Sequence, residues 1–581
     1  MKRNNIKYLF AAAVLGLGLT SCEDFLNKPT EDSYVAGGYY KTDDQCISAV
    51  NYLYNSPWYD FQRGFFKVGE VLAGNYYWSG SPYQNFSLNG NDEDLRNMSY
   101  SLWAVNGHAN IVRNYIAGGG ASDEVKKQTM GECLLWKAMA YFYLVRTFGA
   151  VPIVHDNSGM IEAGSYNSQM RVRKEDVYEY IIMTLEKAIE WLPSSCAEGR
   201  LDKYCAKALL AKVYLTKAGV TGSLNKDDLQ KACDYAKDLL DPNICGRSLE
   251  PNYADIFKLE GNKSKENLIA WRWVVSSQWT SQNTFQSDLG MTGIDEYGDV
   301  WGEWNGPTKD LQDAFGFDIL TNPQTRPDAD SRRKATLMTA GDVIPYLWRD
   351  HGGFDYLRFE FDKDYNASAW GEHRSPTGCN VVKHLYGNNA DHVAVLGTSA
   401  ARMASSLCTP ILRLADVYLV YAEAKTLLGQ GTDPTALKAF NAVHKRAIPG
   451  AIEAKALTFD MIWKERRLEL ALEGDRWYDF VRLSYYNVDK AIQELKAQKR
   501  GTFWNIKLTF RSLYETGQWQ LVNKDDDGKE QTTMYSDDDI TNPINPTKSS
   551  FTIPFPMEDL TFNPHLSEDA VAVDVRKEFS Y

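Results

Sequence analysis

The chain has 581 residues, of which 44% are hydrophobic and 24% are charged, as in globular proteins. Its formal net charge is −13, which excludes nucleic acid as an expected partner because the phosphate backbone would repel it. Aromatic residues make up 13% of the chain, which is more than a helical core needs.

The first 21 residues have the features of a secretory signal peptide. A basic start precedes an apolar run, 8–19, which is shorter than the roughly 20 residues of a membrane-spanning helix. The predicted signal peptide ends in Leu-Thr-Ser before Cys22, a pattern that resembles the bacterial lipobox. We therefore expect Cys22 to be the lipidated first residue of the mature protein and its membrane anchor. An ordinary signal with an incidental cysteine is the alternative.

The other cysteines show no CxxC pair and no Cys/His spacing of a metal site. Cys196–Cys205 and Cys233–Cys245 are near enough in sequence for disulfides, which export would permit. Because several cysteines lie in apolar helical patterns, buried free thiols are the preferred interpretation.

Helical periodicity dominates the first half of the chain. Apolar residues recur at i, i+3 and i+4 spacing, and Gly149 and Pro152 end the first strong helix. Short connectors predict antiparallel helical hairpins. The predicted helices cover 131–154, 173–193, 202–219 and 227–241.

The middle of the chain, 245–405, is rich in Gly, Asn, Asp, Trp and Pro, with short strand patterns such as "NLIAWRWVVSS". Helices return at 410–431, 433–447 and 458–483, and the tail from 500 reads as polar loops and short strands. We predict a mainly α protein in which helical hairpins support a long irregular insertion. Loops of that size are usually functional.

Three further blocks of the sequence are "GECLLWKAMAYFYLVRTFGAVPIV", "PILRLADVYLVYAEA" and "KERRLELALEGDRWYDFVRL". In content and order they resemble the SusD/RagB outer-membrane lipoproteins. "TKDLQDAFGFD" and "DADSRRKATLM" resemble the elements between them. The end, "IPFPMEDLTFNPHLSEDAV", keeps only half of the family's closing motif.

The resemblance implies a SusD-like fold with tetratricopeptide-like helical pairs. We expect a signal peptide at 1–21, an N-terminal helical part at 22–240 and a C-terminal part at 241–581 that carries the ligand-binding insertion, intertwined as one globular domain. By resemblance the protein binds oligosaccharide and serves a SusC-like TonB-dependent transporter, without covalent chemistry. Peptide capture is the alternative within the family; a lipid-anchored glycoside hydrolase and a protein-binding helical scaffold are less favoured.

An acidic pair, Glu23 and Asp24, follows the lipidation cysteine. In bacteria that carry this family, such a cluster is similar to the signal for export to the outer leaflet. The resemblance therefore implies a lipid-anchored protein on the cell exterior. A charged, solvated linker is the alternative interpretation.

The run "KERRLELALEGDRWYDF" carries carboxylates at i, i+4 spacing, which could serve as acid and base in a glycosidase. Arginines are interleaved, so a structural ion-pair network is the preferred interpretation, with Glu469 paired to Arg466 and Arg476. We expect no cofactor. "NKDDDGKEQTTM" (523–534) imitates the start of an EF-hand but has Met534 where a glutamate is needed, so a polar turn is favoured over a calcium site.

The candidate ligand-binding residues are aromatic residues in polar loops. A flat ring covers the C–H face of a sugar while amide and charged groups bind its hydroxyls. The alternative for each tryptophan is a plug that packs its loop against the helices. The candidates are Tyr76, Tyr77, Trp78, Tyr83, Trp279, Trp301, Trp304 and Trp370.

Overall fold

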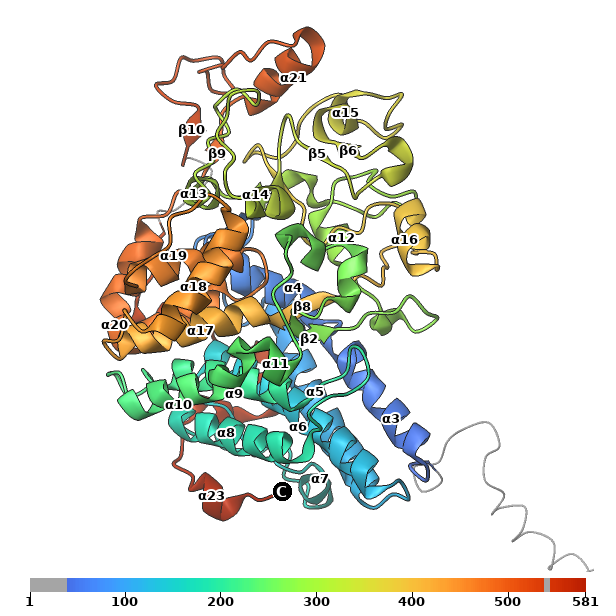
Figure 1. Ribbon diagram of the computed structural model, residues 1–581, viewed down its shortest axis with the longest axis vertical. Helices are drawn as coiled ribbons and strands as arrows, with labels where there is room; N and C mark the ends of the chain where they lie inside the picture. The colour runs from blue at the N-terminus through green and yellow to red at the C-terminus, as the bar shows by residue number, and fades with distance from the viewer. Residues whose placement is uncertain (1–38, 538–543) are drawn as a thin grey trace, which may run out of the picture.

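The computed structural model describes residues 39–537 and 544–581 (Figure 1). Helices of the N-terminal part pack as successive neighbours: α5 on α6, α6 on α8, α8 on α9 and α9 on α10. The predicted mainly α architecture and its helical hairpins are confirmed. The helices are α3 (Asp43–Asn51), α4 (Phe61–Phe66), α5 (Glu93–Ala117), α6 (Asp123–Phe148), α7 (Ser158–Glu162), α8 (Lys174–Trp191), α9 (Lys203–Lys217), α10 (Lys226–Lys237) and α11 (Pro242–Cys245).

Helix α5 escapes the sequence prediction although it has 25 residues. Its buried face includes Ser99, Asn106 and Asn110 beside the aliphatic residues. This mixture breaks the apolar periodicity on which the prediction depends.

The C-terminal helices continue the same stack, because α17 packs on α10 and then on α18 (Figure 1). The segment 458–483, predicted as one helix, is two helices separated by a loop. Leu472 and Gly474 in that loop have φ of +63° and +77°. The loop is held by the Glu70 carboxylate, which accepts a 2.7 Å hydrogen bond from the N–H of Gly474. The helices are α17 (Leu414–Leu427), α18 (Pro434–Ala447), α19 (Phe459–Glu469), α20 (Arg476–Lys496), α21 (Ile506–Thr516), α22 (Met557–Phe562) and α23 (Val575–Glu578).

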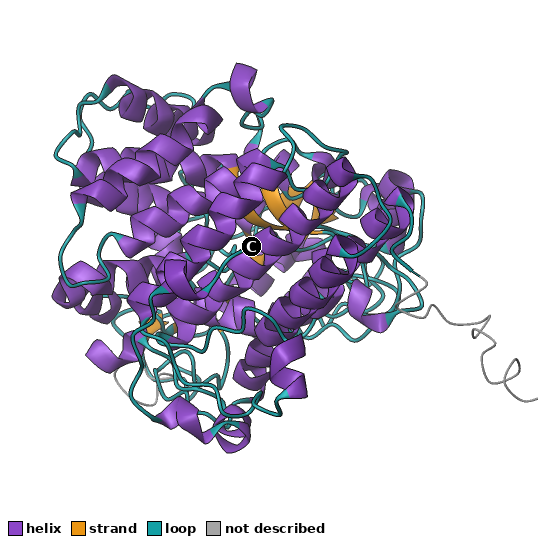
Figure 2. Ribbon diagram, turned by 90° about the horizontal axis from the view of Figure 1, so that it is seen from below, coloured by secondary structure: helices purple, strands orange, loops and turns teal. Residues whose placement is uncertain are grey.

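The insertion lies between α11 and α17, and an antiparallel strand pair closes its base. Strand β2 (Asn267–Trp271), predicted from its sequence, pairs with β8 (Thr409–Arg413), with Asn267 opposite Arg413. Figure 2 shows short strands surrounded by helices and loops. The insertion's helices are α12 (Phe285–Leu289), α13 (Lys309–Ala314), α14 (Arg332–Thr336), α15 (Tyr356–Phe361) and α16 (Asn389–Leu396).

The remaining strands also form two-stranded antiparallel pairs: β1 with β3, β4 with β7, β5 with β6, and β9 with β10. Each has two residues, so side-chain packing holds these loops more than the ladders do. Their bounds are β1 (Tyr76–Tyr77), β3 (Gly306–Pro307), β4 (Leu337–Met338), β5 (Val343–Ile344), β6 (Phe354–Asp355), β7 (Asn380–Val381), β9 (Thr502–Phe503) and β10 (Tyr535–Ser536).

An aromatic cluster joins the insertion to the helical stack. The ring of Trp58 lies 5.5 Å from that of Trp136 on α6 and 5.4 Å from that of Trp271 on β2. All three side chains are fully buried. Aromatic burial of this size stabilises the junction on which the loops of the insertion are mounted.

Within residues 39–537 and 544–581, all eight cysteines are free thiols, so neither candidate disulfide forms here. In the same part of the chain, no helix has both the length and the apolar character needed to cross a membrane. The predicted signal peptide 1–21, Cys22, Glu23 and Asp24 lie outside the described residues.

Candidate ligand-binding site

Pairing of β1 with β3 brings two candidate tryptophans from distant parts of the sequence together. Tyr77 lies opposite Gly306, so Trp78 follows one strand of the pair and Trp304 precedes the other. The side-chain oxygen of Asn305 accepts a 3.0 Å hydrogen bond from the N–H of Ser79. The loop after α4 and the insertion therefore form one surface.

Four of the predicted tryptophans are largely exposed. Trp279, Trp301, Trp304 and Trp370 have 49%, 39%, 49% and 54% of their surface accessible. Tryptophan is usually well buried in a folded protein, so these exposed rings make a candidate interaction surface. With the half-buried Trp78 these residues form what we call the tryptophan platform.

Arg374 holds two rings of the platform. Its guanidinium carbon lies 3.3 Å from the centre of the Trp370 ring and 4.6 Å from that of Trp304. Glu303 lies 3.8 Å from the same guanidinium. These cation–π contacts fix the two indoles relative to one another, so a ligand would meet rings that are already in position.

The carboxylate of Asp288 holds the Trp301 ring in place. The indole N–H donates a 3.1 Å hydrogen bond to Asp288, which also pairs with Arg63 at 3.2 Å. Burial raises the pKa of Asp288 to about 6, although Arg63 and the Trp301 hydrogen bond oppose the rise. Asp288 is therefore ionised at neutral pH and accepts the indole hydrogen bond in its stronger form.

The other two rings are tied to the same scaffold. The ammonium of Lys67 lies 4.6 Å from the centre of the Trp78 ring and pairs with Asp94 at 2.5 Å. Asp94 also lies 3.8 Å from Arg63, which connects Trp78 to the support of Trp301. Trp279 meets the ring of Tyr59 edge to face at 6.3 Å.

Three predicted tyrosines require correction. Tyr76, Tyr77 and Tyr83 have only 1%, 6% and 0% of their surface exposed, so their ring faces are covered by protein. The hydroxyl of Tyr83 donates a 2.6 Å hydrogen bond to Asp92, the residue that caps α5. These rings pack the loop onto the helices, which is the plug alternative, and they offer no surface to a ligand here.

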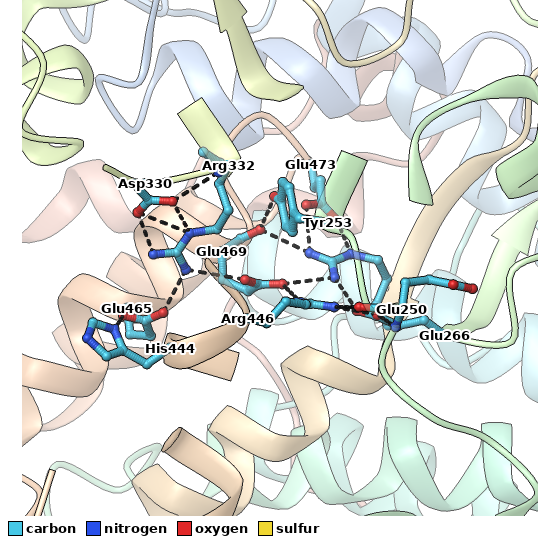
Figure 3. A network of polar contacts seen from close by, with 12 residues as sticks. Glu250, Tyr253, Glu266, Asp330, Arg332, His444, Arg446, Glu465, Glu469 and Glu473 are labelled. Carbon is cyan, nitrogen blue, oxygen red and sulfur yellow. Dashed lines mark hydrogen bonds and ion pairs between the residues drawn. The ribbon is translucent and has the colours of Figure 1, made fainter. Parts of the chain in front are cut away.

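The predicted ion-pair network is confirmed, but its partners differ from those expected. The carboxylate of Glu469 meets Arg332 at 3.2 Å, Arg413 at 3.1 Å, and Arg446 (Figure 3). Arg466 instead pairs with Asp416 at 2.6 Å. Helical spacing misassigned the pairs because α19 ends at Glu469, and the arginines come from α14, β8 and α18.

Electrostatics of this network disfavour acid–base catalysis by its carboxylates. Burial alone would raise the pKa of Glu469, but Arg446, Arg413 and Arg332 outweigh burial and lower the pKa to about 2. Glu473 is also lowered, because Arg413 and Lys383 oppose the effect of burial. A glycosidase acid must keep its proton near neutral pH, which these groups do not.

The segment that imitates an EF-hand forms a polar turn. One oxygen of Asp525 accepts the N–H groups of Asp527 at 3.1 Å and Lys529 at 2.8 Å. The other accepts the Gln531 amide at 2.7 Å. No group of three or more His, Cys, Asp or Glu side chains in the described residues is arranged to hold a metal ion.

Two protein-family models match this chain. A model described as "Starch-binding associating with outer membrane" matches residues 58–215, and the model of the SusD family matches residues 259–569. A SusD-like protein of Bacteroides ovatus is 32% identical over 97% of both chains. The chain belongs to the SusD family. A SusD-like protein P2 of Formosa agariphila is 26% identical over 83% of this chain and 91% of its own.

Solved structures of SusD-like proteins share the fold. One, a crystal structure with xylogluco-oligosaccharide, has a TM-score of 0.75 and 29% identity and covers 91% of this chain and 99% of its own. The platform of this SusD-family chain lies on the loop after α4 and on the insertion, and its role in ligand binding stays a prediction.

The charged supports of the platform escaped the sequence prediction. Arg374 follows Trp370 by four residues, and this spacing was the one local signal that a guanidinium could reach the ring. Arg63, Lys67 and Asp288 carry no such signal, because their partners are distant in the sequence.

Proposed function

We propose that this SusD-family protein captures oligosaccharides on the tryptophan platform and performs no covalent chemistry. The observation that carries the proposal is the set of exposed indoles held in place by buried or half-buried charges. A sugar ring has an apolar C–H face that an indole covers, while neighbouring polar groups bind its hydroxyls. The related structure with xylogluco-oligosaccharide supports a glycan ligand.

Charge balance favours a neutral glycan. Arg63 is paired with Asp288, and Arg374 faces Glu303, so the cations of the platform are matched by carboxylates. A uronate or sulfate would have to compete with these carboxylates and with the negative net charge of the chain.

The test is a glycan array combined with a turnover assay on the chain from residue 23. We expect at least one neutral oligosaccharide to bind with little dependence on salt and to be recovered intact. If extended peptides bind and no glycan does, the result would support the peptide-capture alternative instead. Release of shorter sugars would establish a hydrolase.

We further propose that the protein is anchored through Cys22 in the outer membrane, faces the cell exterior and delivers its ligand to a SusC-like TonB-dependent transporter. The lipobox-like end of the signal, the acidic pair Glu23–Asp24 and the family membership support this placement. Co-purification of the wild-type protein with such a transporter from detergent-solubilised outer membranes is the corresponding test of the partner.

Replacing Cys22 with alanine is expected to abolish acylation, because the thiol is the group that carries the lipid. The variant should accumulate as a precursor or in soluble fractions, as measured by metabolic labelling with a fatty acid and by fractionation. Replacing Cys46 with alanine is the matched control and should leave labelling unchanged. Membrane retention of the Cys22 variant together with an unlabelled wild type would overturn the lipoprotein proposal.

A further inference from the structure

A cavity lies away from the platform, among α5, α7, α22 and the short 3₁₀ helix η11 (Pro564–Ser567). Its volume is about 500 Å³. In Figure 1, α7 lies at the lower end of the molecule, whereas α12, which carries the Asp288 support of Trp301, lies in the upper half. The cavity therefore belongs to a different part of the protein from the site described above.

Aromatic rings line this cavity and are exposed to solvent. Tyr100, Tyr166 and Phe562 have 66%, 51% and 57% of their surface accessible, and Trp103 is half-buried beside them. Tyr166 and Phe562 are stacked, with ring centres 5.7 Å apart and planes at 28°. Tyr100 and Trp103 come from α5, Tyr166 follows α7 and Phe562 ends α22, so the fold assembles this concave apolar surface from three segments that are distant in the sequence.

Two amide side chains in the same wall have unused hydrogen-bonding capacity. Asn106 and Asn563 are 1% and 6% exposed, and their side-chain oxygens accept no hydrogen bond from the described residues. Their amide N–H groups are used, since they donate to the carbonyls of Val154 at 3.3 Å and Gln169 at 2.9 Å. Buried polar groups are normally satisfied, but neighbouring atoms cover both oxygens, so a ligand hydroxyl or a water could donate to them only if those neighbours move aside.

Charges at the rim restrict the ligand further. Glu558 forms a 3.2 Å ion pair with Arg96, so the positive charge of Arg96 is already balanced. Asp559 accepts a 2.5 Å hydrogen bond from Ser99, and burial raises the pKa of its carboxyl. The wall thus offers acceptors and aromatic faces, which suits a neutral molecule with many hydroxyl donors and an apolar face.

We propose that this cavity is a second saccharide-binding site, which holds one or two neutral sugar units while the platform holds another part of the same glycan. The proposal rests on the proposed function, because it assigns the second site to the same class of ligand. Two contacts on one polymer convert the second binding event into an intramolecular one and slow release. The stacked pair Tyr166–Phe562 would carry the sugar face.

The experiment measures binding of the oligosaccharide and the parent polysaccharide selected by an array that includes xylogluco-oligosaccharide. Calorimetry gives the number of sites, and affinity gel electrophoresis gives retention by the polymer. Substituting both Tyr166→Ala and Phe562→Ala is expected to remove one of two binding events and to weaken retention about tenfold. The control is Met557→Ala, which changes a 54% exposed residue on the same helix outside the cavity wall.

A Trp301→Ala/Trp304→Ala variant separates this proposal from the proposed function. We expect this variant to keep a weak binding event that disappears when Tyr166→Ala and Phe562→Ala are added. If the wild type binds one equivalent of glycan and the cavity variants match it on the polymer, the second site is overturned while the platform stands. If the array detects no glycan on the wild type, both proposals fail.

Discussion

Replacing Glu469 with glutamine is expected to lower the free energy of unfolding by about 3–5 kcal/mol, the typical cost of breaking a buried ion pair. The carboxylate is fully buried and faces the guanidinium groups of Arg332, Arg413 and Arg446. A neutral amide removes one negative charge from the buried network, so the positive charges of the three arginines are less well balanced. Urea denaturation at pH 7, followed by circular dichroism, measures the change.

Acid should reduce the difference between this variant and the wild type. The folded-state pKa of Glu469 is lowered from 4.5 to about 2, so its contribution is present above pH 4.5 and is lost as the pH falls toward 2. A depression of this size corresponds to about 3 kcal/mol, in line with the cost of the broken pair. The two unfolding free energies should therefore converge between pH 4.5 and 2.

Glu453→Gln is the matched control, because Glu453 forms an exposed ion pair with Lys445. This substitution should leave the free energy of unfolding unchanged. Glycan affinity of the folded Glu469 variant should equal that of the wild type. A stable Glu469 variant, or one that has lost a measurable cleavage activity, would contradict the structural role of the network.

Replacing Trp304 with alanine is expected to weaken oligosaccharide binding by about 0.5–2 kcal/mol, or about 2- to 30-fold. The loss has two physical sources: the apolar ring face disappears, and Arg374 keeps only Trp370 as an aromatic neighbour. Calorimetry with the array-selected oligosaccharide measures the affinity. The melting temperature should change little, because 49% of the Trp304 surface is exposed.

Ile452→Ala serves as the control, since it removes a 90% exposed apolar side chain in a different segment of the chain. An unchanged affinity for Trp304→Ala together with unchanged affinities for Trp301→Ala and Trp279→Ala would place the ligand elsewhere. Unfolding of these variants would instead mean that the rings are structural plugs.

Local periodicity predicted the helices that bury a continuous apolar stripe, such as α8 and α17. It failed for α5, whose buried face carries Ser99, Asn106 and Asn110, because buried polar side chains look like surface residues in the sequence. It also failed at Gly474, where a contact with Glu70, far away in the chain, decides that the helix must stop.

The residues of the candidate site were likewise predicted only in part. Aromatic residues in polar loops were identifiable because composition alone marks them, and Trp279, Trp301, Trp304 and Trp370 are exposed, as a ligand-binding surface requires. Which ring is exposed and which is packed depends on tertiary contacts, and this is why Tyr76, Tyr77 and Tyr83 were misassigned. The same limit applies to the partners of Glu469, since Arg332 and Arg413 reach it from the insertion and Arg446 reaches it from α18.

The ion pairs of Asp475 affect the order in which the chain can fold during synthesis. Lys212 on α9 and Arg146 on α6 both bind this carboxylate, which lies 263 and 329 residues further along the chain. Until residue 475 has emerged, closing the core around either cation would bury a charge that lacks this compensation. Domains often complete folding from the N-terminus during synthesis. We therefore expect α6 and α9 to complete the packing around these two cations only after α17, which supplies Asp416 to Lys212, and residue 475 have been made.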